Sequence, residues 1–250
     1  MLPIQLKDKV VVITGAGKGL GKELARILSV EGCKTVICSR SENDLAKLCK
    51  EITDNGGKCE YSVVDVTNKK QVYGFIDKTM KKQGRIDVII NNAGYINEWK
   101  EIEKITEQEF ENNFKTNVYS TYYFLKKIVP VMRKQGEGVI VNISSMAGKR
   151  GLPNLTGYCA SKFAVIGLTQ SVAKELENAN VFCFAVCPGG MDTRMRTKLF
   201  GDEDSKRQQS PNYVASVIRD VLVGKIKIPN GGDISIRHGK ITAITPPPEY

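Results

Sequence analysis

Short apolar runs alternate with segments of helical periodicity along most of this chain, and this alternation constrains the fold more than any other feature. The runs are rich in Val and Ile and cover residues 10–14, 35–39, 61–64, 86–91, 139–143 and 181–186. Continuous apolar runs of this length are typical of strands buried on both faces of a parallel sheet. The intervening segments predict helices over residues 20–31, 44–55, 69–82, 107–134, 156–178 and 212–222.

Strands that alternate with helices predict an α/β fold, a Rossmann-type doubly wound parallel sheet with helices on both faces. A weaker strand at 233–237 brings the expected number to about seven. In such a sheet the ligand binds at the carboxyl ends of the strands. Because no linker interrupts the pattern, we expect one dinucleotide-binding and catalytic domain over residues 1–250.

Helix boundaries have local signals. Thr106 and Glu109 have the spacing of a capping box, and Ser41 and Thr67 are candidate N-caps. Pro130 is expected to end or kink the helix predicted over 107–134.

Composition narrows the functional classes. Hydrophobic residues make up 41% and charged residues 26% of the 250 residues, which argues against disorder. The net charge is +10, from 37 Lys and Arg against 27 Asp and Glu. This excess serves solubility or attracts an anionic cofactor or acidic partner. Because the basic residues are dispersed, the sequence predicts no nucleic-acid partner.

The cysteines indicate the cellular compartment that we expect, and the histidine content indicates whether a metal site is expected. The seven cysteines form no CxxC pair, and we interpret all of them as reduced thiols in a cytoplasmic protein. His238 is the only histidine, so the sequence predicts no metal site. We also expect neither a signal peptide nor a membrane span.

A glycine-rich segment follows the first predicted strand. It reads Thr14-Gly15-Ala16-Gly17-Lys18-Gly19-Leu20-Gly21, and the next helix begins inside it. Glycines let the backbone approach a pyrophosphate, and the helix N-terminus offers free N–H groups to the anion. The position of this loop therefore predicts a dinucleotide site.

The end of the second predicted strand bears on the choice of cofactor. An NAD site commonly places Asp or Glu there, whereas this chain has Ser39 and Arg40. A guanidinium pairs with a 2′-phosphate through two parallel hydrogen bonds. With Lys18 in the glycine loop, these residues predict NADP(H); the alternative is that both cations are only solvated.

Tyr158 and Lys162 stand four residues apart in a predicted helix and therefore share one face. A nearby cation is expected to lower the pKa of the phenol, which is ordinarily near 10. The pair would then exchange a proton with a carbonyl or alcohol oxygen. Taken alone, this spacing also fits an exposed Lys beside a packed Tyr.

These motifs together resemble those of the classical short-chain dehydrogenase/reductase family. The glycine loop resembles the family's T-G-x-x-x-G-x-G pattern on Gly15, Gly19 and Gly21, and a basic residue at Lys18 resembles NADP-preferring members. Ser145 lies thirteen residues before Tyr158, the family's spacing of catalytic Ser and Tyr, and is preferred to Ser144.

The resemblance implies a catalytic set of Asn117, Ser145, Tyr158 and Lys162, in which Asn117 anchors a water of a proton relay through Lys162. It also implies that Asp65 and Val66 contact adenine, and that Thr193 of the Pro188–Thr193 segment lies near the carboxamide. The expected cofactor-binding residues are Gly15, Gly17, Lys18, Gly19, Leu20, Gly21, Ser39, Arg40, Asp65, Val66, Asn91, Asn92, Ala93, Gly94, Tyr158, Lys162, Pro188, Gly189 and Thr193.

The implied function is NADP(H)-dependent reduction of a ketone, aldehyde or 3-oxoacyl group to an alcohol. The alternatives are an NAD-linked alcohol or steroid dehydrogenase and a catalytically silent dinucleotide-binding scaffold. After Thr193 the resemblance thins: residues 194–210 take the place of a substrate lid, Gly231 and Gly232 precede the last expected strand, and 246–250 are interpreted as a loose end. The family also implies a homodimer or homotetramer that assembles through the segments 107–134 and 156–178.

Overall fold

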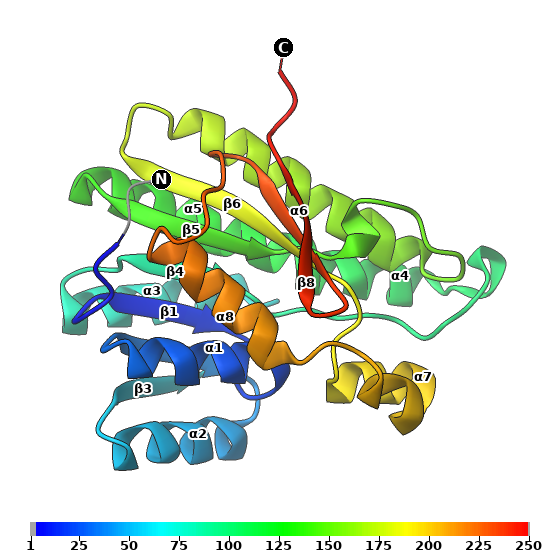
Figure 1. Cartoon of the computed structure of the whole chain (residues 1–250), viewed down its shortest axis with the longest axis horizontal. Coiled ribbons are helices and arrows are strands. Elements are labelled where there is room, and N and C mark those ends of the chain that lie inside the picture. The colour runs from blue at the N-terminus through cyan, green and yellow to red at the C-terminus, as the bar shows by residue number, and fades with distance from the viewer. Residues whose placement is uncertain (1–3, 250) are drawn as a thin grey trace.

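The computed structural model describes residues 4–249, and these contain one sheet of eight strands. The spatial order is β3-β2-β1-β4-β5-β6-β7-β8 (Figure 1). The first seven strands are parallel, and β8 is antiparallel to β7. The strands are β1 Val10–Thr14, β2 Lys34–Ser39, β3 Lys58–Val63, β4 Val88–Asn91, β5 Gly138–Ile143, β6 Val181–Pro188, β7 Asp233–Arg237 and β8 Lys240–Thr245.

The strand order reverses between β1 and β4, which creates the switch point where ligands bind in doubly wound sheets. The doubly wound parallel fold predicted from the sequence is confirmed. Of the strands that the sequence predicted, β1 and β7 have the expected bounds, and the others differ by a few residues at their ends.

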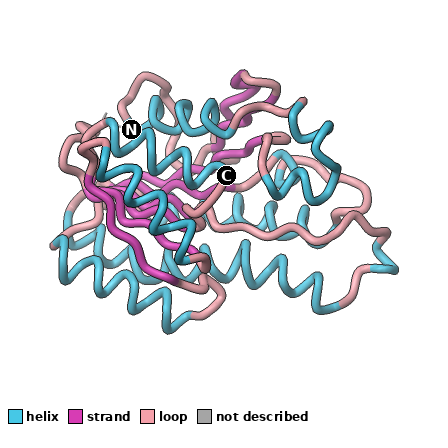
Figure 2. The backbone as a smooth tube through the Cα atoms, turned by 90° about the horizontal axis from the view of Figure 1, so that it is seen from below, coloured by secondary structure: helices cyan, strands magenta, loops and turns pink. Residues whose placement is uncertain are grey.

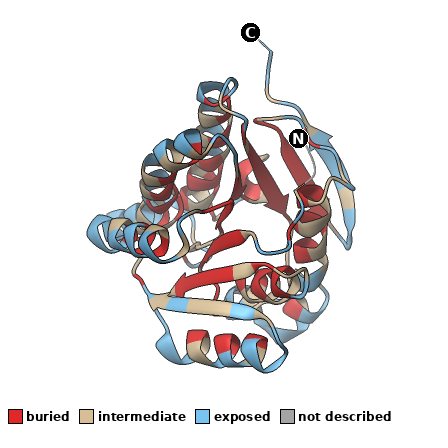
Figure 3. Cartoon of the chain, turned by 90° about the vertical axis from the view of Figure 1, so that its left-hand side faces the viewer, coloured by how far each residue is buried: buried red, intermediate tan, exposed pale blue. Residues whose placement is uncertain are grey.

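Helices cover both faces of the sheet (Figure 2). They are α1 Gly19–Val30, α2 Glu42–Asp54, α3 Lys69–Gln83, α4 Glu107–Asn113, α5 Ser120–Gln135, α6 Thr156–Glu175, α7 Arg194–Lys206 and α8 Pro211–Leu222. Apolar residues of α1, α2 and α8 share one buried cluster, and those of α3, α5 and α6 share another. The sheet therefore has a core on each side, and its central strands are buried (Figure 3).

The segment 107–134, which the sequence predicted as one helix, is interrupted. Between α4 and α5 lies a single π-helical stretch, Phe114–Tyr119. Such π turns occur mostly as single-turn bulges inside α-helices, often at functional sites. Pro130 does not end the helix either, because α5 continues to Gln135 with Ile128 and Met132 packed in the core.

Cap assignments were partly right. The capping box of Thr106 and Glu109 at the start of α4 is confirmed. Ser41 occupies the N-cap position of α2, although its side chain makes no capping hydrogen bond. The prediction for Thr67 was wrong: Asn68 caps α3, and its side chain accepts from the backbone N–H groups of Lys70 and Gln71.

The structure adds two features to what the sequence analysis expected. An eighth strand, β8, pairs with β7 through the turn around Gly239, which the sequence analysis missed. The cysteines are not all reduced, because Cys49 on α2 and Cys59 on β3 form a disulfide with a Cα–Cα distance of 5.2 Å. The tight turn at Gly56 and Gly57 brings the end of α2 back along β3 and places the two side chains together.

Within residues 4–249, no helix is both long and apolar enough to cross a bilayer.

Phe124 on α5 provides a test of the second core. Its side chain is 1% exposed, and its ring packs edge-on against Phe75 with 6.4 Å between the ring centroids. We expect Phe124→Ala to lower the free energy of unfolding by about 3–5 kcal/mol, because burial is lost and a cavity is left. Urea denaturation measures this, with the exposed Val30→Ala as a control expected to change within about 0.5 kcal/mol. An equally small change for Phe124→Ala would contradict the assignment.

Candidate active site

The glycine loop between β1 and α1 is shaped by close backbone contacts. Gly15 and Gly19 have φ angles of 65° and 53°, in the left-handed region that favours glycine. A Cβ at Gly15 would lie 2.8 Å from the Cα atom of Ala93, and one at Gly21 would lie 2.5 Å from Nδ2 of Asn92. No side chain caps α1 at Lys18. The first N–H groups of α1 therefore remain free to bind an anion.

This loop forms one wall of a cleft of about 750 Å³ at the carboxyl ends of the strands. The cleft brings together most of the site residues that the sequence predicted. Those in its wall are Gly15, Gly17, Lys18, Gly19, Leu20, Ser39, Arg40, Asp65, Val66, Asn92, Ala93, Gly94, Ser145, Tyr158, Lys162, Pro188, Gly189 and Thr193.

Gly21, Asn91 and Asn117 lie behind this wall instead of in it. Gly21 allows α1 to pack against Asn92. Asn91 is 4% exposed, and its Nδ2 donates to Oδ1 of Asn142 at 2.8 Å in the sheet. For Gly21 and Asn91 the structure therefore indicates packing and positioning of the loop, and no direct lining of the cleft.

One end of the cleft is basic. Lys18 of the loop and Arg40, which follows β2, both line it, and Arg40 is exposed. The Lys18 Nζ atom lies 3.0 Å from an oxygen of Asp44. A hydrogen bond from Ser41, and to a smaller extent one from Lys18, holds the pKa of Asp44 below its usual value. The sequence analysis missed Asp44 because it looked for an acid at the end of β2, whereas α2 brings this carboxylate back from its first turn.

The other end carries Ser145, Tyr158 and Lys162. Ser145 follows β5, while Tyr158 and Lys162 lie one turn apart on α6. The Lys162 Nζ atom is 5.8 Å from the centre of the Tyr158 ring and donates to the carbonyl oxygen of Ile143 at 2.9 Å. The predicted constellation is thus assembled at one place.

The expected lowering of the pKa of Tyr158 was wrong. Burial raises the pKa of Tyr158, and a hydrogen bond with Ser145 acts in the opposite direction. Burial also lowers the pKa of Lys162, to about 8. Desolvation is therefore the largest cause of both shifts. The phenol retains its proton at neutral pH and is able to donate it.

Ser144 and Ser145 have different partners. The Ser144 hydroxyl donates to the backbone carbonyl of Lys162 at 2.8 Å, which ties β5 to α6. The Ser145 hydroxyl accepts from the N–H of Ala147 at 3.1 Å and also bonds with Tyr158. The Ser144 hydroxyl is thus committed to α6, whereas the Ser145 hydroxyl lies beside Tyr158.

Asn117 lies in the π-helical stretch and is 1% exposed. Its Oδ1 accepts from the N–H of Tyr95 at 2.7 Å, and its Nδ2 donates to the carbonyl of Tyr95 and to Ser161. A Cβ at Gly94 would lie 3.4 Å from Oδ1 of Asn117 and 3.6 Å from Nζ of Lys162. Asn117 therefore fixes the strand-end loop beside Lys162.

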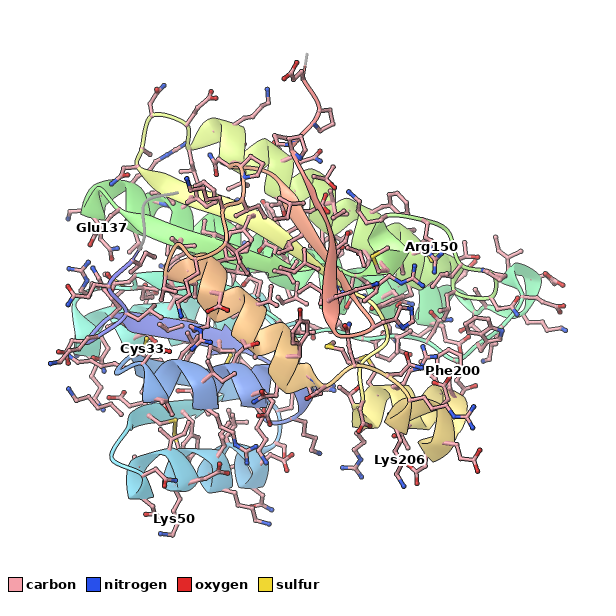
Figure 4. The ribbon with its side chains drawn as sticks, in the orientation of Figure 1. Cys33, Lys50, Glu137, Arg150, Phe200 and Lys206 are labelled. Carbon is pink, nitrogen blue, oxygen red and sulfur yellow. A yellow bond between two sulfur atoms is a disulfide. The ribbon has the colours of Figure 1, made fainter. Side chains whose placement is uncertain are left out.

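A helix over the mouth of the cleft is capped by Thr193, whose hydroxyl accepts from the N–H of Arg196. This helix, α7, bends at Gly201. Phe200 on α7 contacts Trp99, with 5.2 Å between the ring centroids. Figure 4 shows Phe200 and Lys206 on the side of the molecule away from Glu137, which precedes β5. The helix thus occupies the first part of the predicted lid at the ligand edge of the sheet.

Several lining residues were not predicted, among them Tyr95, Thr116, Met191, Arg194, Met195 and Lys198. Three of them belong to α7, where no sequence motif signals which side chains face the cleft.

A family model described as short chain dehydrogenase matches residues 9–204 of this chain. The chain belongs to the short-chain dehydrogenase family. The family assigns it as an oxidoreductase that acts on CH–OH or C=O groups and uses a nicotinamide dinucleotide. Its substrate is therefore a small molecule.

Similar proteins include reductases from plants and bacteria. The chain is 32% identical to the NADPH-dependent pterin aldehyde reductase of Arabidopsis thaliana over 228 residues, which is 91% of this chain and 93% of the relative. The crystal structure of levodione reductase matches with a TM-score of 0.88 at 29% identity, covering 93% and 97% of the two chains. A 3-ketoacyl-(acyl-carrier-protein) reductase from Brucella melitensis, complexed with NADH, matches with a TM-score of 0.85 at 27% identity, covering 92% and 97%.

Proposed function

We propose that this short-chain dehydrogenase reduces a ketone, aldehyde or 3-oxoacyl group with NADP(H). The proposal rests on how polar side chains are distributed along one cleft. Lys18, Ser39 and Arg40 lie at one end, and the Ser145–Tyr158 pair lies at the other. A dinucleotide with a 2′-phosphate fits this arrangement, with its phosphate among the cations and its nicotinamide beside Tyr158. When bound, NADPH supplies the hydride for the carbonyl carbon.

The chain supplies the proton and the charge stabilisation. The Ser145 hydroxyl donates to the carbonyl oxygen, which stabilises the negative charge that develops there. The Tyr158 phenol then donates its proton to the same oxygen. Lys162 provides a positive charge beside the phenol, and Asn117 holds the Gly94–Tyr95 backbone next to that lysine. Because the pKa of Tyr158 is raised, the phenol carries the proton that reduction requires at neutral pH.

The relatives differ in cofactor, so the argument for NADP(H) rests on this chain's own residues. The plant pterin aldehyde reductase is NADPH-dependent, whereas the Brucella reductase was crystallised with NADH. In this chain Asp44, whose carboxylate lines the same cleft, is already paired with Lys18. Arg40 has no carboxylate within salt-bridge distance in the described part of the chain. Its guanidinium is therefore available to a phosphate.

The proposal is tested by titrating the protein with NADPH and NADH, followed by cofactor oxidation with a panel of carbonyl compounds that includes 3-oxoacyl thioesters. We expect NADPH to bind at least tenfold more tightly, about 1.4 kcal/mol, and to be oxidised with at least one carbonyl. Tighter binding of NADH would contradict the cofactor assignment. Binding of NADPH without turnover of any carbonyl would favour a silent scaffold.

Replacing Arg40 tests the same assignment at one residue. We expect Arg40→Asp to reduce the NADPH preference by tenfold or more, because a carboxylate repels a 2′-phosphate and accepts hydrogen bonds from a ribose hydroxyl. The ratio of kcat/KM for NADPH and NADH measures this effect. Lys47→Asp makes the same charge change on the exposed side of α2 and should leave the ratio unchanged. Equal ratios for Arg40→Asp and the wild type would mean that Arg40 is only a surface cation.

A further inference from the structure

The start of α7 lies directly against the phosphate-binding loop. A Cβ at Gly19 would be 3.3 Å from Cγ2 of Thr193, the residue that caps α7. Gly19 and Thr193 both line the cleft. Arg194, the first residue of α7, is therefore anchored beside the loop that holds the cofactor phosphates, even though the rest of the helix extends toward Trp99.

Arg194 acts on the same corner of the cleft as the predicted phosphate-binding cations. It lines the cleft together with Lys18 and Arg40. Its positive charge contributes, with that of Lys18, to the lowered pKa of Asp44. Three basic side chains from three separate elements thus line the cleft, from the glycine loop, the end of β2 and the first turn of α7, and those of Lys18 and Arg194 both act on Asp44.

The guanidinium of Arg194 is not committed to another group. The neighbouring Arg196 pairs with Asp204 and lies over the ring of Phe200, 3.9 Å from its centroid. Within residues 4–249, by contrast, no carboxylate lies within 4.0 Å of the Arg194 side chain. Arg196 therefore maintains the shape of α7, while Arg194 is exposed and able to bind an anion.

We propose that Arg194 binds the 2′-phosphate of NADP(H) from the lid side of the cleft, opposite Lys18 and Arg40. This inference rests on the proposed NADP(H) dependence. A planar guanidinium forms two parallel hydrogen bonds with a phosphate. It therefore sets the orientation of the phosphate and also pairs with its charge. The bound 2′-phosphate then holds the first turn of α7 across the cleft. Cofactor choice and the position of the substrate lid are coupled through this one residue.

The test compares Arg194→Gln with the wild type by fluorescence titration of NADPH and NADH at low ionic strength. We expect Arg194→Gln to weaken NADPH binding about tenfold, or about 1.4 kcal/mol, and NADH binding less than twofold. Arg207→Gln is the matched control, because it removes one positive charge just after α7, at an exposed position outside the cleft. It should leave both affinities unchanged. Arg194→Lys retains the charge and should lose less affinity for NADPH than Arg194→Gln.

The outcomes separate this inference from the function on which it rests. Equal weakening of NADPH and NADH binding by Arg194→Gln would overturn the role at the 2′-phosphate and point to the pyrophosphate. No change in either affinity would also overturn it. If the wild type does not bind NADPH more tightly than NADH, both the proposed cofactor and the role of Arg194 are contradicted. If that preference holds and Arg194→Gln retains it, only the role of Arg194 is lost.

Discussion

Tyr158→Phe is expected to reduce kcat for carbonyl reduction by at least about 10³-fold while NADPH binds within twofold of the wild-type affinity. General-acid catalysis contributes on the order of 10²–10⁴-fold, and the variant loses both the proton donor and the hydrogen bond with Ser145. The ring itself remains, so the packing of α6 beside the cleft is preserved. Steady-state kinetics and a fluorescence titration measure the two quantities separately.

A control in the same cleft sharpens the result. Tyr95→Phe removes an identical hydroxyl from another residue of the wall, and we expect kcat to change by no more than about threefold. A Tyr158→Phe protein with near-normal turnover would overturn the catalytic assignment. A Tyr158→Phe protein that loses NADPH binding to the same extent as turnover would instead make Tyr158 a binding residue.

The sequence predicted those parts of the site in which the local backbone geometry requires a particular residue type. The glycine loop is an example, because Gly15 and Gly19 adopt left-handed φ angles and Gly21 packs where a Cβ would collide with Asn92. The pairing of Tyr158 with Lys162 follows from helical periodicity alone. The choice of Ser145 came from a family spacing and stays a prediction, while the structure shows the hydroxyl of the rival Ser144 bonded to the backbone of Lys162.

The parts that the sequence did not predict depend on how separate elements meet. Nothing near Asp44 or Arg194 reveals that α2 and α7 bring these side chains to one corner of the cleft. The disulfide of Cys49 with Cys59 depends on how the α2–β3 turn folds back. Helical periodicity also conceals the π-helical stretch, because insertion of one residue changes the direction of Asn117 without changing the composition of the segment. The pKa of Tyr158 depends on burial, which a local pattern does not quantify.

Lys162→Met is expected to lose activity and gain stability at the same time. The lysine is 4% exposed, and burial lowers its pKa to about 8 from an ordinary value near 10.5. Without its charge beside Tyr158, we expect kcat to fall by about 10²-fold or more. In the wild type, the rate of reduction should decline as the pH rises through about 8, because Lys162 then loses its proton.

The stability of the same variant follows from proton linkage. Between pH 8 and pH 10.5 the unfolded wild-type chain binds more protons at this lysine than the folded chain does, so the free energy of unfolding rises with pH in that interval. Below pH 8 both states are protonated and the cost of burying the charge is fully present. Lys162→Met removes that cost, and its advantage in thermal stability should be largest at pH 7 and shrink as the pH approaches 10.5.

Lys78→Met, at an exposed position on α3, should show no such trend. A Lys162→Met protein that is less stable than the wild type at pH 7 would mean that the hydrogen bond to Ile143 outweighs the cost of burying the ammonium group.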